Sequence, residues 1–254
     1  MAARVVENYQ PAPDLLKDRV ILVTGAGDGI GRAAALTYAQ HGATVILLGR
    51  TIKKLEAVYD EIENAGCPQP AIIPLNLEGA TLRDYDETAM QIDETFGRLD
   101  GLLHNAGILG QRTPIELYDP ETWNQVLQVN LTSHFMMTQS FIPLLRKSGS
   151  ASMIFTSSSV GRQGRAHWGA YAISKAGIES LMQVLADELD DTRNNIRVNS
   201  LNPGATRTQM RRLAYSGEHP ENNPRPEEIM DAYLYLMGPD SEGVTGEQFD
   251  AQKK

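Results

Sequence analysis

The chain has 254 residues, 41% of them hydrophobic, and a formal net charge of -9 at pH 7. This length and composition are typical of one α/β domain that builds its own core. The acidic balance, with no Lys/Arg cluster beyond Arg211-Arg212, argues against a nucleic-acid partner. The single cysteine, Cys67, cannot form an internal disulfide, which favours a reducing compartment.

No segment of the sequence is expected to direct the chain into or across a membrane. The first residues, Met1–Asp14, contain Glu7 and two prolines and lack the apolar stretch of a signal peptide. No apolar run approaches the roughly 20 residues that span a bilayer. We therefore expect a cytoplasmic protein that acts on a small molecule.

Short apolar runs alternate with longer helical patterns along the chain. The runs are rich in Val, Ile and Leu, as expected for strands buried on both faces of a parallel sheet. The predicted strands are Arg19–Val23, Thr44–Leu48, Ala71–Leu75, Gly101–His104, Ser152–Thr156 and Arg197–Leu201. The helical patterns between them include the two long segments Glu121–Leu145 and Tyr171–Leu189. This alternation predicts an α/β fold, with a Rossmann-type doubly wound parallel sheet in a single domain.

Two segments lie outside this pattern. Residues 1–17 precede the first strand and contain Pro11 and Pro13, which predicts an extended N-terminal arm before a domain spanning 18–254. The segment Thr208–Pro226 is polar, contains three prolines, and follows the last predicted strand. Ligands bind at the carboxyl ends of strands in such sheets. This substrate-loop insertion is therefore either a mobile lid or a plain surface loop.

A glycine loop follows the first predicted strand. It reads Thr24-Gly25-Ala26-Gly27-Asp28-Gly29-Ile30-Gly31 and leads into a predicted helix, Arg32–His41. Glycines permit a tight turn and let backbone N–H groups approach a pyrophosphate, which the helix N-terminus also favours. A loop without a ligand is the alternative, but the strand–turn–helix context favours a dinucleotide. A P-loop is excluded because no Lys-Ser/Thr follows the last glycine.

The residue after the second predicted strand indicates which dinucleotide is bound. NAD-binding chains carry a carboxylate about 20 residues past the glycines, where it binds the adenosine ribose hydroxyls. This strand ends Leu47-Leu48-Gly49-Arg50-Thr51, with no carboxylate. Arg50 can pair with a 2′-phosphate, so we expect NADP(H) in preference to NAD(H). The alternative for Arg50 is a solvated surface charge.

Tyr171 and Lys175 stand four residues apart in a predicted helix, so their side chains share one face. A free tyrosine, with a pKa near ~10, is a poor base at neutral pH. A neighbouring ammonium stabilises the phenolate and lowers that pKa. The pair is thus suited to exchange a proton with a carbonyl oxygen. By itself, this spacing more often marks a buried ring beside a surface charge.

The motifs taken together resemble the short-chain dehydrogenase/reductase family over roughly residues 15–250. The resemblance rests on features that occur in the family's order: the glycine loop, His104-Asn105-Ala106-Gly107, Asn130, Ser158, Tyr171-x-x-x-Lys175 and Pro203-Gly204-x-x-x-Thr208. Three further stretches look closer still to the bacterial YciK-like members: Tyr9-Gln10-Pro11, 155–165 and Phe249-Asp250-Ala251-Gln252. The family implies a dehydrogenase or reductase that acts on CH–OH groups and the corresponding carbonyls.

The resemblance implies catalytic roles for four residues. Tyr171 would donate a proton to the substrate carbonyl during reduction and remove it during oxidation. Lys175 would bind the nicotinamide ribose hydroxyls and depress the pKa of the tyrosine. Ser158 would hydrogen-bond the reacting oxygen, and Asn130 would anchor a water that connects Lys175 to solvent. Two plainer alternatives stay open: Ser158 capping backbone groups, and Asn130 bonding the backbone of a kinked helix.

The resemblance also implies a set of cofactor contacts. Asn105 would brace the sheet beside the adenosine ribose, and Asn76 with Leu77 would contact the adenine. Thr206 and Thr208 would meet the nicotinamide carboxamide. The expected cofactor-binding residues are Gly25, Asp28, Gly29, Ile30, Gly31, Arg50, Asn76, Leu77, Asn105, Ala106, Gly107, Tyr171, Lys175, Pro203, Gly204, Thr206 and Thr208.

The sequence departs from the family pattern at two places. His104 stands where the family usually has Asn, and we expect it to be structural. The segment from Val244 to Gln252 does not end in the family's Asp-Gly-Gly. That strand often helps to assemble tetramers, so both a homodimer and a homotetramer stay open. A dimer through the helices that bear Asn130 and Tyr171 is the simpler expectation.

Other functions are less consistent with the sequence. A hydrolase using Ser158 with His167 as its base would need a Gly-x-Ser-x-Gly elbow, which is absent. No metal is expected, because the five histidines are scattered, at positions 41, 104, 134, 167 and 219. The remaining rival is a catalytically silent NADP(H)-binding sensor or scaffold. A protein that only binds the dinucleotide has no need of Ser158, which favours the enzyme.

No motif fixes the substrate. We expect its pocket to be lined by Gly107–Thr113, Gly161–Trp168 and Thr208–Pro226. Arg112, Arg162 and Arg165 in these segments either meet an anionic substrate or pair with surface acids. The excess of acidic over basic residues, 32 against 23, favours the second. The use of NADPH would imply carbonyl reduction.

Overall fold

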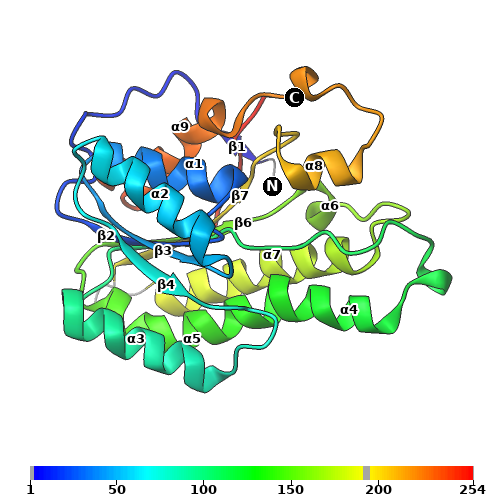
Figure 1. Cartoon of the computed structure of the whole chain (residues 1–254), viewed down its shortest axis with the longest axis horizontal. Coiled ribbons are helices and arrows are strands. Elements are labelled where there is room, and N and C mark those ends of the chain that lie inside the picture. The colour runs from blue at the N-terminus through cyan, green and yellow to red at the C-terminus, as the bar shows by residue number, and fades with distance from the viewer. Residues whose placement is uncertain (1–2, 191–194, 254) are drawn as a thin grey trace.

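A parallel sheet between two layers of helices forms the centre of the protein (Figure 1). The computed structural model describes residues 3–190 and 195–253. Their strand order across the sheet is β1-β8-β7-β6-β5-β2-β3-β4, and every neighbouring pair is parallel. The strands are β1 (Arg4–Val5), β2 (Val20–Thr24), β3 (Thr44–Gly49), β4 (Ala71–Pro74), β5 (Gly101–His104), β6 (Ala151–Thr156), β7 (Ile196–Asn202) and β8 (Gln248–Asp250). The predicted doubly wound α/β fold is confirmed.

The helices divide between the two faces of the sheet. One face is covered by α1 (Gly29–Gln40), α2 (Ile52–Asn64) and α9 (Met230–Met237). The other is covered by α3 (Leu82–Phe96), α5 (Ser133–Arg146) and α7 (Gly169–Leu189), with α4 (Pro120–Leu127) packed against α7. Two short helices, α6 (Ser159–Arg162) and α8 (Gln209–Ala214), follow β6 and β7. Both faces of the sheet are therefore buried, which explains its continuous apolar strands.

The predicted helical segment Glu121–Leu145 is interrupted in the structure. Helix α4 ends at Leu127, and a π-helical turn, Gln128–Thr132, precedes α5. Asn130 lies in this turn and is completely buried. A π-helical turn changes the hydrogen-bond pattern of the backbone and is frequent at functional sites. The apolar periodicity of the sequence continues through it and so gives no sign of the change.

The N-terminal arm is fixed along the edge of the sheet. Its strand β1 pairs with β8, with Arg4 opposite Phe249. The Tyr9 hydroxyl donates to Asp240 at 2.7 Å, and the Tyr9 ring lies 5.6 Å from that of Tyr235. The described part of the arm combines strand β1 with turns near its end, where the Leu15 and Lys17 amides donate to the Ala12 and Asp14 carbonyls, and the sequence reveals neither feature.

The insertion 208–226 is a structured element in place of a plain loop. It contains α8 and a short 3₁₀ turn, Pro220–Asn222. Arg211 makes a two-point ion pair with Glu218, at 2.6 and 2.7 Å, and Asn223 donates to the same carboxylate. The Arg207 amide donates to the Pro224 carbonyl, which joins the two ends of the insertion.

Candidate active site

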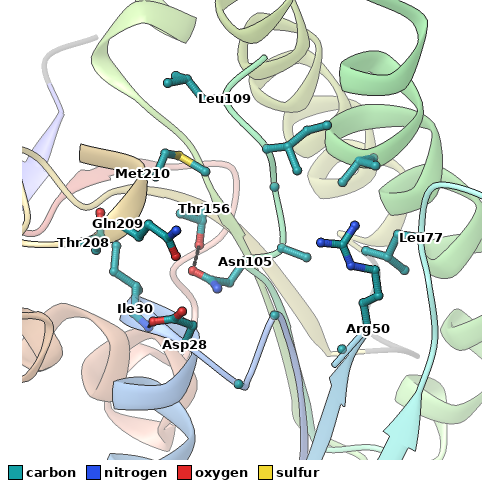
Figure 2. A pocket seen from close by; sticks show the side chains of 18 of the residues that line it. Asp28, Ile30, Arg50, Leu77, Asn105, Leu109, Thr156, Thr208, Gln209 and Met210 are labelled. Atoms are coloured by element: carbon teal, nitrogen blue, oxygen red, sulfur yellow. Dashed lines mark hydrogen bonds between the residues drawn. The ribbon is translucent and has the colours of Figure 1, made fainter. Parts of the chain in front are cut away.

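A cavity of about 550 Å³ opens at the carboxyl ends of the central strands. It lies over β2 and β5, where the chain order across the sheet changes direction and where doubly wound sheets bind their ligands. Figure 2 shows Arg50 and Leu77 on one side of the cavity and Asp28, Ile30 and Thr208 on the other. The predicted cofactor residues that line it are Gly25, Asp28, Gly29, Ile30, Arg50, Asn76, Leu77, Asn105, Ala106, Gly107, Tyr171, Lys175, Pro203 and Thr208.

The glycine loop has the conformation that its sequence predicts. Gly25 and Gly29 have φ angles of +67° and +51°, a region that residues with a side chain rarely adopt. A Cβ on Gly31 would overlap the Gly25 carbonyl oxygen, so Gly31 makes a close backbone approach and does not line the cavity. Asp28 caps α1 by accepting from the Gly29 amide at 2.8 Å. The positive end of α1 therefore faces the cavity.

Arg50, at the end of β3, points its guanidinium into the cavity beside Leu77 (Figure 2). In the part of the chain that the structure describes, no hydrogen bond or ion pair engages it. Its neighbour Lys54 differs, because it pairs with Asp28 at 2.5 Å. Thr51 and Lys54 also line this wall and were not among the predicted residues. Thr51 and Lys54 follow Arg50 by one and four residues, and this closeness in the sequence could have indicated that they line the same part of the cavity.

Asn105 joins two strand ends at the floor of the cavity. Its backbone amide donates to the Thr24 hydroxyl at 2.9 Å, and its side-chain amide donates to the Thr24 carbonyl at 3.2 Å. The Thr156 hydroxyl donates weakly to the Asn105 side chain, at 3.5 Å (Figure 2). These bonds hold β2, β5 and β6 together beneath any bound nucleotide. The arrangement fits the bracing role that the family resemblance implies.

Tyr171 and Lys175 face the cavity from the first turns of α7, and both are buried. The Lys175 ammonium donates to the Thr156 carbonyl at 2.7 Å and lies 5.9 Å from the centre of the Tyr171 ring. Burial lowers the pKa of Lys175 to about 8, against the opposing charge of Glu179. Burial raises the pKa of Tyr171 to about 12, against an opposing hydrogen bond from Ser158.

The pKa of Tyr171 differs from the sequence expectation. A depressed pKa was expected because Lys175 shares the helix face. In the structure, desolvation of the phenolate dominates, so the phenol keeps its proton at neutral pH. A protonated phenol in this place can donate to an oxygen that gains negative charge.

Ser158 and Asn130 adjoin residues of the cavity lining, Ser157 and Val129, without being part of that lining themselves. Ser158 caps α6, with its hydroxyl 3.4 Å from the Val160 amide, and it also bonds Tyr171. The Asn130 side chain accepts from the Ile108 amide at 2.8 Å and donates to the Ile108 carbonyl at 2.9 Å and to Ser174 at 3.2 Å. Ser158 thus caps the backbone and contacts Tyr171. The side chain of Asn130 hydrogen-bonds the backbone of Ile108, which is the plainer of the two roles that the sequence left open for it.

The loop after β7 is held from the C-terminal segment. Thr206 is buried, and its hydroxyl donates to the Pro203 carbonyl at 3.2 Å. The side chain of Gln252 donates to the Pro203 and Ala205 carbonyls at 2.7 and 3.0 Å. Gly204 packs against Gln252 with a φ angle of +72°. Gly204 and Thr206 therefore shape this loop, while Pro203 and Thr208 reach the cavity wall.

The outer end of the cavity is apolar, lined by Leu109, Met210 and Leu213. These residues come from the two predicted segments Gly107–Thr113 and Thr208–Pro226. The third predicted segment, Gly161–Trp168, contributes no residue to the cavity wall. Trp168 instead packs beside Tyr171, with ring centres 5.6 Å apart.

The three arginines of these segments have three different environments. Arg162 is mostly buried and pairs with two buried acids, Glu179 and Asp250, so its partners are not at the surface as expected. Arg112 stacks between Trp168 and Tyr215, 4.4 and 4.9 Å from the ring centres, and donates to the Ala214 carbonyl. Arg165 is exposed. The stack links the loop after β5 to α8 at the apolar end of the cavity.

The fold, the glycine loop and the Tyr171/Lys175 pair at one cavity define a nicotinamide-dependent oxidoreductase of the short-chain type. The chain belongs to the short chain dehydrogenase family, whose model matches residues 19–219. This finding confirms the resemblance inferred from the motifs. In the part of the chain that the structure describes, no helix is both long enough and apolar enough to cross a membrane.

Similar proteins cover nearly the whole chain. YciK of Escherichia coli (strain K12), an uncharacterized oxidoreductase, is 53% identical over 245 residues, which is 96% of each chain. A putative short chain dehydrogenase from Pseudomonas syringae matches with a TM-score of 0.95 and 58% identity, covering 96% of this chain and 99% of its own. Another from Escherichia coli CFT073, complexed with NADPH, has a TM-score of 0.93 and 53% identity, covering 96% and 100%.

Proposed function

We propose that the protein transfers a hydride between NADP(H) and a small carbonyl compound or secondary alcohol, with Tyr171 as the acid/base. The observation that carries this proposal is the meeting of Tyr171 and Lys175 with the glycine loop at one cavity. The buried phenol supplies a proton donor, and the loop supplies an anion-binding helix end. Carbonyl reduction is the direction that NADPH favours.

The residues around the cavity fit a nicotinamide dinucleotide phosphate. Gly25 and Gly29 leave the backbone open to a pyrophosphate, and Arg50 offers a guanidinium with no partner among the described residues. A structural relative at 53% identity is complexed with NADPH. We propose the same cofactor here, with Arg50 binding the 2′-phosphate. When bound, the cofactor supplies or accepts the hydride.

The side chains around Tyr171 would carry out the proton transfer and bind the substrate oxygen and the cofactor ribose. Tyr171 gives its proton to the substrate oxygen as negative charge develops there, and the Ser158 hydroxyl donates a second hydrogen bond. The Lys175 ammonium binds the nicotinamide ribose hydroxyls and stabilises the phenolate that remains. The π-helical turn at Asn130 would hold the water that returns a proton to Lys175. The apolar residues Leu109 and Met210 favour an uncharged, partly hydrophobic substrate.

A screen of NADPH consumption with aldehydes, ketones and diketones tests this function. We expect turnover of at least one class, and a Tyr171→Phe variant should lose about 10²–10⁴-fold in kcat while it still binds NADPH. Retained turnover in that variant would remove Tyr171 from the acid/base role. Tight NADPH binding with no turnover of any compound would favour the silent sensor or scaffold.

We further propose a homodimer through α5 and α7. Both helices present large apolar side chains to solvent, among them Phe135, Ile173 and Val184, each about half exposed. The outer edge of β8 is already covered by β1 of the same chain. Light scattering of Phe135→Glu should give a monomer, whereas Leu117→Glu, at an exposed site on another segment, should leave the dimer intact. A dimer in both variants would contradict this interface.

A further inference from the structure

Glu179 is a buried carboxylate that none of the roles above uses. It lies one helical turn beyond Lys175 on α7 and is only 5% exposed. A lone buried carboxylate is strongly unfavourable, so its partners explain why it is there. Its two oxygens accept four hydrogen bonds, from Ser157 Oγ (2.6 Å), Arg162 Nε (3.0 Å), Ser200 Oγ (2.7 Å) and Gln248 Nε2 (2.9 Å).

These contacts indicate that Glu179 is ionised. Each oxygen accepts two bonds, and the Arg162 and Gln248 nitrogens can act only as donors in them. The Arg162 guanidinium, a fixed cation 3.0 Å from one of the carboxyl oxygens, favours the charged carboxylate. Arg162 also pairs with Asp250 at 2.7 Å. One guanidinium therefore lies between two carboxylates.

Glu179 also joins the strand and helix that carry Ser158 to the helix that carries Tyr171. Ser157, next to Ser158, and Arg162, at the end of α6, both bond Glu179. Between them, Gly161 packs so closely on α7 that a Cβ there would lie 2.7 Å from the Lys175 Cβ. The short helix α6 is thus fixed to two successive turns of α7. This double attachment sets the position of Ser158 relative to Tyr171.

The charge of Glu179 acts on Lys175. Burial lowers the pKa of Lys175, and Glu179 opposes that effect. Lys175 is also within electrostatic reach of two buried histidines, His104 on β5 and His134 on α5. Burial holds the pKa of both imidazoles low, so they are neutral and cannot replace the carboxylate. Tyr171, the remaining titratable neighbour, is neutral as well.

We propose that Glu179 is a positioning residue of the active site, which keeps the Lys175 ammonium charged and fixes Ser158 through Ser157 and Arg162. It touches neither substrate nor cofactor and acts only through these neighbours. The proposal rests on the proposed function, because it gives Lys175 and Ser158 the roles stated there. It adds a residue that the sequence motifs did not single out.

The variant Glu179→Gln tests the electrostatic part, since it keeps the shape and removes the charge. We expect the alkaline limb of kcat, and the pH above which NADPH affinity falls, to move about one unit or more to lower pH. Glu179→Asp should restore both. Glu188→Gln, an equal charge change at an exposed site near the end of α7, should move neither. A purely structural role would lower the melting temperature without moving either limb.

A second variant should shift the two pH limbs in the opposite direction. Arg162→Gln removes the cation that pairs with Glu179, so the negative charge acting on Lys175 is less compensated and both limbs should move to higher pH. The Arg162→Gln variant tests whether Glu179 keeps Lys175 charged if Glu179→Gln does not fold. Unmoved limbs in the variants that fold would overturn the proposal. If the wild type turns over no carbonyl, the proposed function fails, yet the pH dependence of NADPH binding still tests Glu179 by itself.

Discussion

The Lys175 ammonium lies 5.9 Å from the centre of the Tyr171 ring, and burial moves the pKa values of the two groups in opposite directions. The phenol holds its proton more firmly than in water, and the ammonium holds its proton less firmly. At neutral pH, the site therefore combines a protonated phenol with a neighbouring cation. Of the two groups, Lys175 is the one that titrates near physiological pH.

The first prediction concerns the pH dependence of activity. Lys175, with a pKa of about 8, is cationic below that pH and loses its charge above it. Carbonyl reduction should therefore be constant near neutrality and fall about tenfold per pH unit well above pH 8. Tyr171, with a pKa of about 12, stays protonated over this range, so its titration should not change the rate there. Steady-state kcat and NADPH affinity measured across this range check the assignment, and a limb that persists in Lys175→Met would contradict it.

The second prediction concerns cofactor choice. The guanidinium of Arg50 points into the cavity with no partner in the described part of the chain (Figure 2). A charge-assisted contact of this kind contributes about 1.5–3 kcal/mol, so Arg50→Ala should weaken NADPH binding by about 10–150-fold. NADH binding should hardly change. Fluorescence titrations with both cofactors measure this.

A matched control for Arg50→Ala is Arg83→Ala, on the exposed surface of α3. It removes the same charge at a site outside the cavity and should leave both affinities unchanged. Equal losses for NADPH and NADH in Arg50→Ala would mean that Arg50 contacts a part common to both cofactors. Wild-type preference for NADH would mean that Arg50 is only a surface charge.

The central strands and the shared helix face of Tyr171 and Lys175 were predictable because their signals are local. Strand Gly101–His104 was predicted with its observed ends, and the other five predicted strands differ by one residue at one end or both. Each is a short apolar run that needs no knowledge of its neighbours. The Tyr171–Lys175 spacing is equally local, because a helix places both side chains on one face wherever it lies.

The missed features depend on contacts between distant residues. Strands β1 and β8 are short and partly polar, and they form by pairing with distant parts of the chain: β8 with β7, and β1 with β8. Arg162 looked like a surface charge because its partners, Glu179 and Asp250, lie 17 and 88 residues away. The raised pKa of Tyr171 reflects burial, which spacing along a helix does not reveal.

The third prediction concerns stability in acid. His134 is fully buried, and among the described residues neither ring nitrogen makes a hydrogen bond of good geometry. Burial lowers its pKa from 6.5 to about 3 in the folded protein. The unfolded chain therefore binds a proton at His134 at a higher pH than the folded protein does. The free energy of unfolding is highest above pH 6.5 and falls as the pH drops from the unfolded pKa of 6.5 to the folded pKa of about 3. The loss from His134 should reach about 2 kcal/mol near pH 5.

Replacing His134 by Leu tests this prediction. The substitution removes both ring nitrogens and keeps an apolar contact with Phe155, whose ring centre is 6.4 Å away. Urea unfolding should show a smaller fall in stability from about pH 7 to about pH 5. His219→Leu, at an exposed site, should retain the wild-type fall. An unchanged acid dependence in His134→Leu would show that another group causes it.

The last prediction concerns the stack of Arg112 on Trp168 and Tyr215, beside the apolar end of the cavity. Arg112 stacks on Trp168 and Tyr215 and donates to the Ala214 carbonyl at the end of α8. Arg112→Leu should free α8, because each cation–π contact contributes about 0.5–1 kcal/mol at an exposed site. Trypsin should then cleave after Arg211 or Arg212 about five to thirty times faster, as a local opening equilibrium of that size implies.

Arg83→Leu is the control, because it removes another exposed arginine far along the chain from α8. It should leave the cleavage rate at Arg211 and Arg212 unchanged. If NADPH protects these sites in the wild type and fails to do so in Arg112→Leu, the insertion acts as a lid that Arg112 helps to close. Equal cleavage rates in the wild type and both variants would mean that the ion pair of Arg211 with Glu218 holds α8 without help from Arg112.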